Sequence, residues 1–288
     1  MPAHLSLPEL LLQATAHARS LRGRVLVVKL GGSAMEDPAA TRGTLQSVVA
    51  LQTLGVRLVL VHGGGKPIDR AMEAAGLTPK KVAGRRYTDE ATLKIVVRVL
   101  AELNDGLRGQ LGGLGVKTRQ FVDAESYPIR GERLTLTGPD GTPIDLGWVG
   151  RPTDICTDDL NQMLKTGIAV LMSLAVAPDE SWLNVNADTA ASAVAGAMKA
   201  EACLFLTDTP GVLRDVRKAA SLIPRLTRSE CQQLLRDGVI AGGMVPKVEA
   251  CFEALDAGAG RAVILDGRNP HALLNWFLSE PAGTEIVP

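Results

Sequence analysis

The sequence of 288 residues predicts an α/β protein built on a mostly parallel sheet. Short aliphatic segments, typical of strands that are buried on both faces, alternate along the chain with longer helical patterns. Hydrophobic residues make up 46% of the chain and aromatic residues only 3%, a mixture suited to aliphatic strands covered by alanine-rich helices. Crossover connections in such a sheet are right-handed and place helices on both of its faces.

The order of the elements follows from hydrophobic periodicity. The expected strands are Val25–Leu30, Leu58–His62, Ala169–Leu174, Cys203–Thr207 and Ala262–Leu265. The helices expected around them are roughly Ala39–Leu54, Pro67–Ala75, Asp89–Leu111, Asp158–Lys165, Thr189–Lys199, Val245–Ala257 and Pro270–Leu278. The stretch from Gly131 to Gly141, which includes Pro139, has instead the pattern of a β-hairpin.

Residues 1–23 form a separate unit at the start of the chain. Ser6, Pro8 and Glu9 have the spacing of a capping box with proline in the first turn of a helix. A short amphipathic helix must bury its apolar face, either on its own domain or on a neighbouring subunit. The apolar face consists of Leu7, Leu10, Leu11, Ala14, Ala18 and Leu21.

Charge and cysteine content disfavour several classes of function. The 31 basic and 31 acidic side chains give a formal net charge of zero, so no overall positive field attracts nucleic acid or an acidic membrane. The four cysteines and four histidines are scattered, which disfavours a disulfide framework or a zinc site. The chain has no apolar run long enough for a bilayer and no signal-peptide pattern, so we expect a cytoplasmic protein.

Ligands of an open parallel sheet bind beyond the carboxyl ends of its strands, and two glycine-rich turns are expected there. Lys29 is followed by Gly31 and Gly32, which puts a cation beside backbone N–H groups that a phosphate can approach closely. A tight turn with a solvated lysine is an equal alternative for this segment. In the segment His62–Pro67, three glycines precede a helix, and this arrangement is typical of an anion site. The spacing matches neither the Rossmann fingerprint nor the P-loop.

A third turn carries amides and a carboxylate. Asn184 and Asn186 alternate on an extended segment, and Asn186 or Asp188 would cap the alanine-rich helix that follows. Capping alone is the alternative, although these polar residues exceed what a cap needs. Arg86 could clamp a carboxylate, and Lys247 follows another glycine turn, but either could be a solvated surface charge. Cations, glycine N–H groups and an orienting carboxylate together favour phosphoryl transfer.

At these positions the sequence resembles the amino-acid-kinase family over nearly its whole length. The KxGGSAM and NxNAD patterns favour the member that phosphorylates the γ-carboxylate of N-acetyl-L-glutamate in arginine biosynthesis, over the aspartate, glutamate, uridylate and carbamate kinases. Six segments occur in the order that the family shows: Lys29–Met35, His62–Gly65, Arg86–Asp89, Asn184–Asp188, Thr207–Leu213 and Gly242–Lys247.

The resemblance implies a three-layer αβα sandwich with a substrate lobe at residues 24–183 and a nucleotide lobe at residues 184–288. It implies that Lys29 and Lys247 flank the transferring phosphoryl group and that Asp188 orients both lysines. The implied substrate-binding residues are Gly64, Gly65, Arg86, Asn184 and Asn186. Those implied at the nucleotide are Gly31, Gly32, Thr207, Asp208, Gly211 and Met244. The cofactor would be ATP with Mg²⁺ held mainly by its phosphates, without a metal site of the protein's own.

This assignment is chemically coherent. The attacking γ-carboxylate is already ionised at neutral pH, because a carboxyl pKa is about 4, so the reaction needs no general base. The enzyme has to hold two anions in line and offset their repulsion with lysines, glycine N–H groups and the metal ion.

Some segments depart from the family pattern and leave the substrate and the regulation open. Residues 115–123 lack the expected Gly-Leu-Ser-Gly-like stretch, Ala169–Val176 lacks a proline-rich turn, and Lys66 replaces a neutral residue. Alternatives are a kinase of another acylated acidic amino acid, such as carrier-bound aminoadipate, and a non-catalytic sensor. The N-terminal helix and Gly283–Val287 resemble arginine-inhibited members that form ring-like hexamers. We therefore predict a hexamer in preference to a dimer and name arginine as a candidate feedback inhibitor, although His271–Phe277 lacks the expected glutamate.

Overall fold

The structure is a computed structural model that describes residues 6–82, 85–119, 121, 123–138, 140–278 and 282–288. The parts of the expectations above that fall on residues 1–5, 83–84, 120, 122, 139 and 279–281 lie outside the described residues.

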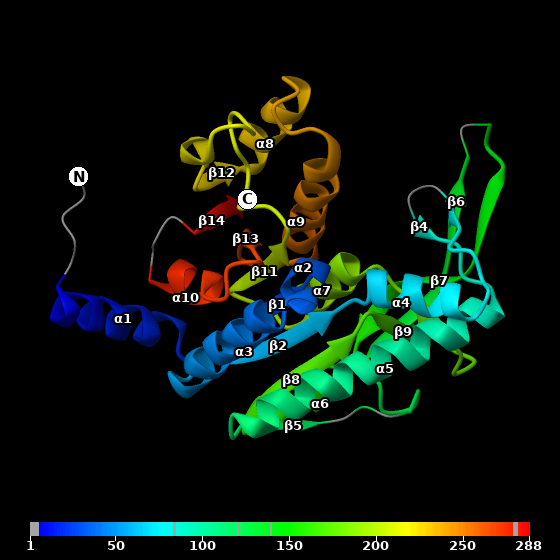
Figure 1. Cartoon of the computed structure of the whole chain (residues 1–288), viewed down its shortest axis with the longest axis horizontal. Helices are drawn as coiled ribbons and strands as arrows, with labels where there is room; N and C mark the ends of the chain where they lie inside the picture. Colours follow the sequence, from blue (N-terminus) through cyan, green and yellow to red (C-terminus); the bar gives the residue numbers. More distant parts are fainter. Residues whose placement is uncertain (1–5, 83–84, 120, 122, 139, 279–281) are drawn as a thin grey trace.

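One large sheet forms the centre of the domain (Figure 1). Neighbouring strands are parallel except for the pair β13 and β14, so the chain reverses direction near one edge. The strands follow the order β12 (Arg225–Thr227), β14 (Gly283–Val287), β13 (Ala262–Asp266), β11 (Ala202–Thr207), β1 (Val25–Leu30), β2 (Arg57–His62), β8 (Gly167–Met172) and β5 (Lys117–Arg119). The mostly parallel sheet and the five aliphatic strands predicted for it are confirmed.

One predicted strand is divided between two sheets. The expected run Ala169–Leu174 stays in the large sheet only as far as Met172, where β8 ends. Ser173 then turns the chain: its N–H donates to the carbonyl of His62 at 2.9 Å, and its carbonyl accepts from the N–H of Val185 at 3.1 Å. The next strand, β9, begins at Leu174 and belongs to the smaller sheet.

The smaller sheet closes on itself and lies at one end of the domain (Figure 1). The predicted hairpin is confirmed as the pair β6–β7, which supplies its longest strands. The four strands are β6 (Ile129–Thr137), β7 (Pro143–Ile155), β9 (Leu174–Val176) and β10 (Trp182–Asn184), and a separate two-stranded ribbon consists of β3 (Lys81–Val82) and β4 (Arg85–Arg86).

Helices cover both faces of the large sheet, which confirms the three-layer αβα arrangement. Leu26 and Val28 of β1 face one layer, and Val25 and Val27 face the other, so alternate residues of the strand enter separate hydrophobic clusters. α6, α7 and α9 pack into the cluster of Val27, whereas α3, α10 and the carboxyl-terminal part of α5 pack into that of Leu26. The helices are α1 (Leu7–Leu21), α2 (Gly32–Glu36), α3 (Pro38–Thr53), α4 (Gly65–Ala74), α5 (Glu90–Gly113), α6 (Thr157–Met163), α7 (Ala187–Ala197), α8 (Arg228–Arg236), α9 (Val245–Ala257) and α10 (Ala272–Phe277), with 3-10 turns η1 (Ala219–Ser221) and η2 (Gly242–Met244).

Two of these helices, α2 and α8, were not expected. α8 carries a recognisable start signal, since Thr227 and Glu230 form a capping box in which the N–H of Thr227 donates to Glu230 Oε2 at 2.7 Å. α2 is a short helix of five residues directly after β1, too short to give a periodic pattern.

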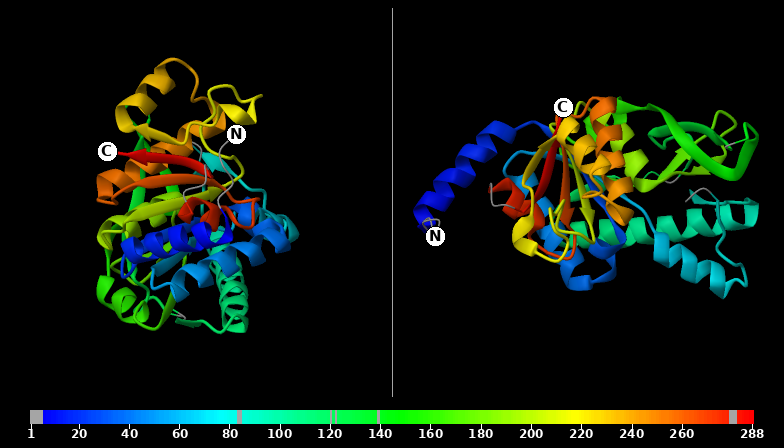
Figure 2. Two further views of the ribbon diagram at one scale, coloured as in Figure 1. Left: turned by 90° about the vertical axis from the view of Figure 1, so that its left-hand side faces the viewer. Right: turned by 90° about the horizontal axis from the view of Figure 1, so that it is seen from above.

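α1 projects from the body of the domain (Figures 1 and 2). The predicted capping box is present, because the N–H of Ser6 donates to Glu9 Oε2 at 2.7 Å. At the carboxyl-terminal end of the predicted apolar face Ala18 and Leu21 are buried, and Ala14 packs partly buried against the same cluster. Leu11 remains 68% exposed. Among the described residues, no helix has both the length and the apolar character needed to cross a bilayer.

Candidate functional site

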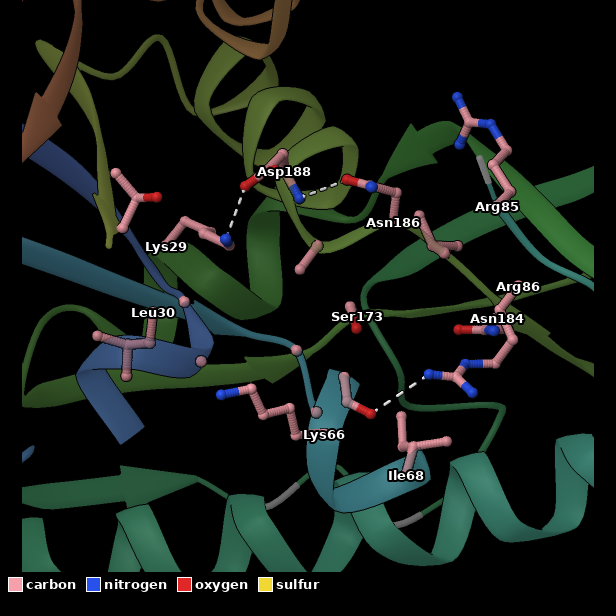
Figure 3. Close-up of a pocket in the computed structure, with 18 of the residues that line it drawn as sticks. Lys29, Leu30, Lys66, Ile68, Arg85, Arg86, Ser173, Asn184, Asn186 and Asp188 are labelled. Atoms are coloured by element: carbon pink, nitrogen blue, oxygen red, sulfur yellow. Dashed lines mark hydrogen bonds and ion pairs between the residues drawn. The ribbon is translucent and has the colours of Figure 1, made fainter. Parts of the chain in front are cut away.

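A cavity of about 510 Å³ lies where the carboxyl ends of β1, β2 and β11 meet the first turns of α2, α4 and α7 (Figure 3). It has the position at which an open parallel sheet binds ligands. Most of the predicted site residues line it together: Lys29, Gly31, Gly32, Gly64, Gly65, Arg86, Asn184, Asn186, Asp188, Thr207 and Asp208.

Lys29 and Asp188 form an ion pair on the floor of this cavity. Lys29 is near the end of β1, and its Nζ lies 2.9 Å from Oδ1 of Asp188 in the first turn of α7 (Figure 3). The lysine side chain is only 15% exposed. Its ammonium group is therefore fixed in a partly buried position where it can meet a bound anion.

The two predicted glycine turns differ in why they need glycine. The N–H of Gly31 donates to the carbonyl of Leu206 at 3.0 Å, and a Cβ at Gly31 would come within 2.4 Å of that oxygen. Gly31 is therefore required by the close approach of the neighbouring strand. A Cβ at Gly65 would meet nothing within 4 Å, since it would stand in the open space at the start of α4. In the described chain, the N–H groups of Gly64 and Gly65 have no acceptor, so they are free to bind an anion.

Arg86 lies on the opposite side of the cavity from Lys29, at the end of β4 (Figure 3). Its Nη1 is 2.5 Å from Oδ1 of Asp69 on α4, and its Nη2 donates to the carbonyl of Gly65 at 3.3 Å. These contacts hold the guanidinium group beside the second glycine turn. Its position is suited to a carboxylate at this end of the cavity.

The asparagines of the third turn have separate roles in the structure. Asn186 is the N-cap of α7, and its Oδ1 accepts from the N–H groups of Asp188 at 2.8 Å and Thr189 at 3.1 Å. Asn184 ends β10, and its Nδ2 donates to Oγ1 of the buried Thr88 at 3.0 Å. Capping thus explains Asn186 in part, whereas Asn184 places an amide in the cavity without capping a helix.

Lys247 differs from expectation. Its Nζ lies 2.9 Å from Oδ1 of Asp208 and donates to the carbonyl of Gly243 at 3.3 Å, so its partner in this structure is Asp208 and not Asp188. The reason is local: α9 begins beside the turn that follows β11, where Asp208 also accepts from Oγ1 of Thr207 at 3.0 Å. The hydrogen bond from Lys247 lowers the pKa of Asp208 below its ordinary value, against the opposing effect of partial burial. Asp188 therefore orients one lysine of the two in this structure.

Besides Lys247, two predicted residues are absent from the cavity wall. Gly211 has a φ of +132° and packs against the strand β14, where a Cβ would come within 2.6 Å of Oγ1 of Thr284. Met244, in η2, packs on the hydrophobic cluster beneath α9. The structure gives Gly211 a backbone role and Met244 a packing role, and their contact with nucleotide stays a prediction.

The structure adds residues that the sequence reasoning did not place in the site. Lys66 Nζ lies 2.7 Å from Oε2 of Glu36, and this ion pair joins α4 to α2 at the cavity. Lys81 and Arg85 of the two-stranded ribbon also line the wall, as does Ser173 at the break between β8 and β9. Lys66 was visible as an unusual cation in the glycine turn. The others carry no local signal, since only the folded chain brings them to the cavity.

The cavity has a surplus of positive charge. Of the described residues that line it, five are cationic and three are acidic. Lys29 and Lys66 have carboxylate partners in the wall, whereas Lys81 and Arg85 have no ion pair with any described residue. The arrangement can therefore hold more than one anionic group at once.

Comparisons with known proteins identify the family of this chain. Residues 24–266 match the model of the amino acid kinase family. The chain is 40% identical over 286 residues to the acetylglutamate kinase of Methylobacterium nodulans, covering 96% of this chain and 93% of that protein. It is also 40% identical over 279 residues to the acetylglutamate kinase of Azorhizobium caulinodans, covering 94% of this chain and 92% of that protein.

A solved structure shares the fold. The N-acetylglutamate synthase from Neisseria gonorrhoeae, complexed with coenzyme A and N-acetyl-glutamate, superposes with a TM-score of 0.84 at 25% identity. The match covers 99% of this chain but 64% of the synthase, so the synthase has a further part without a counterpart here. With the family model matching most of the sequence and two relatives matching along nearly all of it, the chain belongs to the amino acid kinase family.

Proposed function

We propose that this protein phosphorylates the γ-carboxylate of N-acetyl-L-glutamate with ATP, giving N-acetyl-L-glutamyl 5-phosphate in arginine biosynthesis. One observation carries the proposal: the Lys29–Asp188 ion pair and the free N–H groups of Gly64 and Gly65 face one cavity with Arg86. Relatives that are named acetylglutamate kinase along nearly the whole chain support the choice of substrate.

The site residues act on different parts of the reacting molecules. Lys29 and the N–H groups of Gly64 and Gly65 stabilise the charge on the transferring phosphoryl group, and Lys247 approaches it from the nucleotide side. Arg86, with Asn184 and Asn186, binds the acylated end of the substrate at the other side of the cavity. The nucleophile is a carboxylate that is already ionised at neutral pH, so the chain has only to align it and to offset its repulsion from ATP.

The division into lobes follows from this assignment. Residues 24–183 hold the acylated amino acid, and residues 184–288 hold the nucleotide. The residues that lie at the nucleotide in this proposal are Gly31, Gly32, Thr207, Asp208, Gly211 and Met244. The surplus of cations and the free N–H groups fit the charge of ATP. Mg²⁺, which neutralises phosphate charge, would be held mainly by the nucleotide phosphates, as is usual for this ion. The four cysteines are free thiols, which supports a cytoplasmic location.

A trapping experiment tests the activity. An acyl phosphate reacts with hydroxylamine to give a stable hydroxamate, so the enzyme with Mg-ATP and N-acetyl-L-glutamate should accumulate hydroxamate in step with ADP. L-Glutamate and N-acetyl-L-aspartate serve as matched controls, because one lacks the acetyl group and the other is shorter by one methylene. Hydroxamate from L-glutamate at an equal rate would contradict the assigned specificity. ADP without hydroxamate would contradict a carboxylate acceptor.

We further propose a hexamer that is inhibited by arginine. α1 leaves Leu11 and Leu12 exposed, as expected for a helix that packs on another subunit. A second cavity, of about 410 Å³, lies between the end of α1, α10 and β14, and His17, Trp276 and Glu285 line it. Light scattering should give the mass of six chains, and deletion of residues 1–21 should leave dimers. A dimer mass for the intact chain would refute the hexamer, and activity unchanged by arginine would refute the inhibition.

A further inference from the structure

His62 is the last residue of β2 and directly precedes the second glycine turn, yet its side chain is fully buried and does not line the cavity. Its Nε2 lies 3.1 Å from Nδ2 of Asn104, a buried residue of α5. Its Nδ1 lies 3.2 Å from the carbonyl oxygen of Gly63. Both ring nitrogens are therefore engaged, and neither faces the cavity.

The hydrogen bonds fix the tautomer of this imidazole. Asn104 Nδ2 also lies 3.1 Å from the carbonyl of Val170. A flipped amide would set Oδ1 of Asn104 against that carbonyl, acceptor against acceptor, so the amide nitrogen must face both partners. Asn104 then donates to Nε2 of His62, which has to be unprotonated. The proton of the neutral ring is on Nδ1 and is donated to the carbonyl of Gly63.

The carbonyl of Gly63 depends on this donor. Gly63 lies outside α4, whose N-cap is Gly64, so its carbonyl takes no part in the helical hydrogen bonds. Residue 67, one turn further along the chain, is proline and has no N–H to offer it. The next carbonyl, that of Gly64, accepts normally from the N–H of Ile68 at 2.8 Å. Gly63 is partly buried and lines the cavity, and the hydrogen bond from His62 gives its carbonyl a fixed partner within the chain.

The orientation of the Gly63 carbonyl sets the direction of the N–H of Gly64, which lines the cavity. In a planar trans peptide the C=O and the following N–H point to opposite sides. Because His62 holds the carbonyl of Gly63 toward the buried side, the N–H of Gly64 is turned away from it. Gly64 lines the cavity, and its N–H has no acceptor in the described chain.

We infer that His62 and Asn104 are positioning residues that lock the Gly63–Gly64 peptide so that the N–H of Gly64 faces the phosphoryl group. The inference rests on the proposed phosphoryl transfer for the identity of that ligand, but not for the hydrogen-bond network. Burial keeps the ring neutral, as the network requires, because it lowers the pKa of His62 to about 4.

A pair of matched variants separates positioning from general packing. In His62→Asn, the amide nitrogen can take the place of Nδ1 and still donate to the carbonyl of Gly63. In His62→Gln, the amide reaches the place of Nε2 and can still pair with Asn104, but the donor to Gly63 is lost. We expect His62→Gln to lower kcat on the order of 10²-fold, as for the loss of one oriented donor, and His62→Asn to retain most of kcat. KM for N-acetyl-L-glutamate should be the same in both. Equal loss of kcat in the two variants at equal melting temperature would overturn the inference.

The tautomer can be measured without any assay of activity. The sequence has four histidines, so the imidazole ¹⁵N resonances of His62 are identified as those missing from the His62→Asn spectrum. At neutral pH we expect Nδ1 protonated and Nε2 unprotonated. An Nε2-protonated ring or an imidazolium would overturn the inference whatever the kinetics of the two variants. If N-acetyl-L-glutamate proved not to be the substrate, the proposed function would fail while this measurement still decided the network.

Discussion

Lys29 Nζ and Asp188 Oδ1 lie 2.9 Å apart at the point where the central strand β1 meets the start of α7. Asp188 thereby holds the ammonium group in a fixed position beside both glycine turns. Lys29→Ala should lower kcat on the order of 10²- to 10³-fold, because the lysine stabilises charge that develops in the transition state. Asp188→Asn keeps the size of the side chain but loses its charge, so it should also lower kcat, with little change in KM for either substrate. Steady-state kinetics measure both effects. A rise in KM with kcat unchanged would assign the pair to ground-state binding.

The glycines of the two turns should respond differently to the same change. Gly31→Ala would force a Cβ to within 2.4 Å of the Leu206 carbonyl oxygen, so it should destabilise the fold by about 1–3 kcal/mol. In Gly65→Ala the added Cβ would meet no atom within 4 Å, so the melting temperature of this variant should match that of the wild type. Its methyl group would stand beside the free N–H groups and should weaken phosphate binding and turnover. Thermal melts and kinetics of the pair check this, and a stable, active Gly31→Ala enzyme would contradict the packing argument.

Arg86 should act on the acyl substrate more than on ATP. Arg86→Lys retains the positive charge but loses the forked geometry, so KM for N-acetyl-L-glutamate should rise roughly 10- to 100-fold while KM for ATP stays near the wild-type value. Arg85→Lys is the matched control on the neighbouring residue, which has no ion pair with any described residue. If Arg86→Lys raised the KM for ATP as much as the KM for N-acetyl-L-glutamate, the assignment of Arg86 to substrate binding would be contradicted.

Lys247 controls the ionisation of Asp208. The hydrogen bond from Lys247 lowers the pKa of Asp208, so the pair stabilises the fold above the ordinary aspartate pKa of about 3.9, and this stabilisation is lost as the pH falls through the lower folded-state pKa. Lys247→Met should raise the pKa of Asp208, because only the effect of burial and weaker hydrogen bonds remain. Carboxyl ¹³C NMR against pH measures this shift. Lys66→Met, which breaks a different ion pair, should leave the titration of Asp208 unchanged.

The elements that are fixed by local pattern could be read from the sequence. The aliphatic strand β1, the Asn186 cap and the cations beside glycines are local signals, and the fold then collects them at one edge of the sheet. β14 was missed because its antiparallel pairing with β13 depends on where the chain returns, and a five-residue strand carries little periodicity.

The partners of the site residues were harder to predict than the residues themselves. Lys247 pairs with Asp208 because α9 begins next to the turn after β11, a proximity that no spacing along the chain reveals. Asn104 lies 42 residues from His62, and a single asparagine within a helix gives no sign that it binds a buried ring. Sequence reasoning found Lys29, Arg86 and Asp188, and the structure supplies further charged groups of the wall and the hydrogen bonds that orient the site.

The central claim is tested most directly by ADP release from the enzyme with Mg-ATP and N-acetyl-L-glutamate, run beside L-glutamate, L-aspartate and the Lys29→Ala variant. We predict turnover only with the acetylated substrate and its loss in the variant, at an unchanged melting temperature. No turnover with N-acetyl-L-glutamate by a folded, ATP-binding protein, or full turnover by Lys29→Ala, would contradict the proposed function.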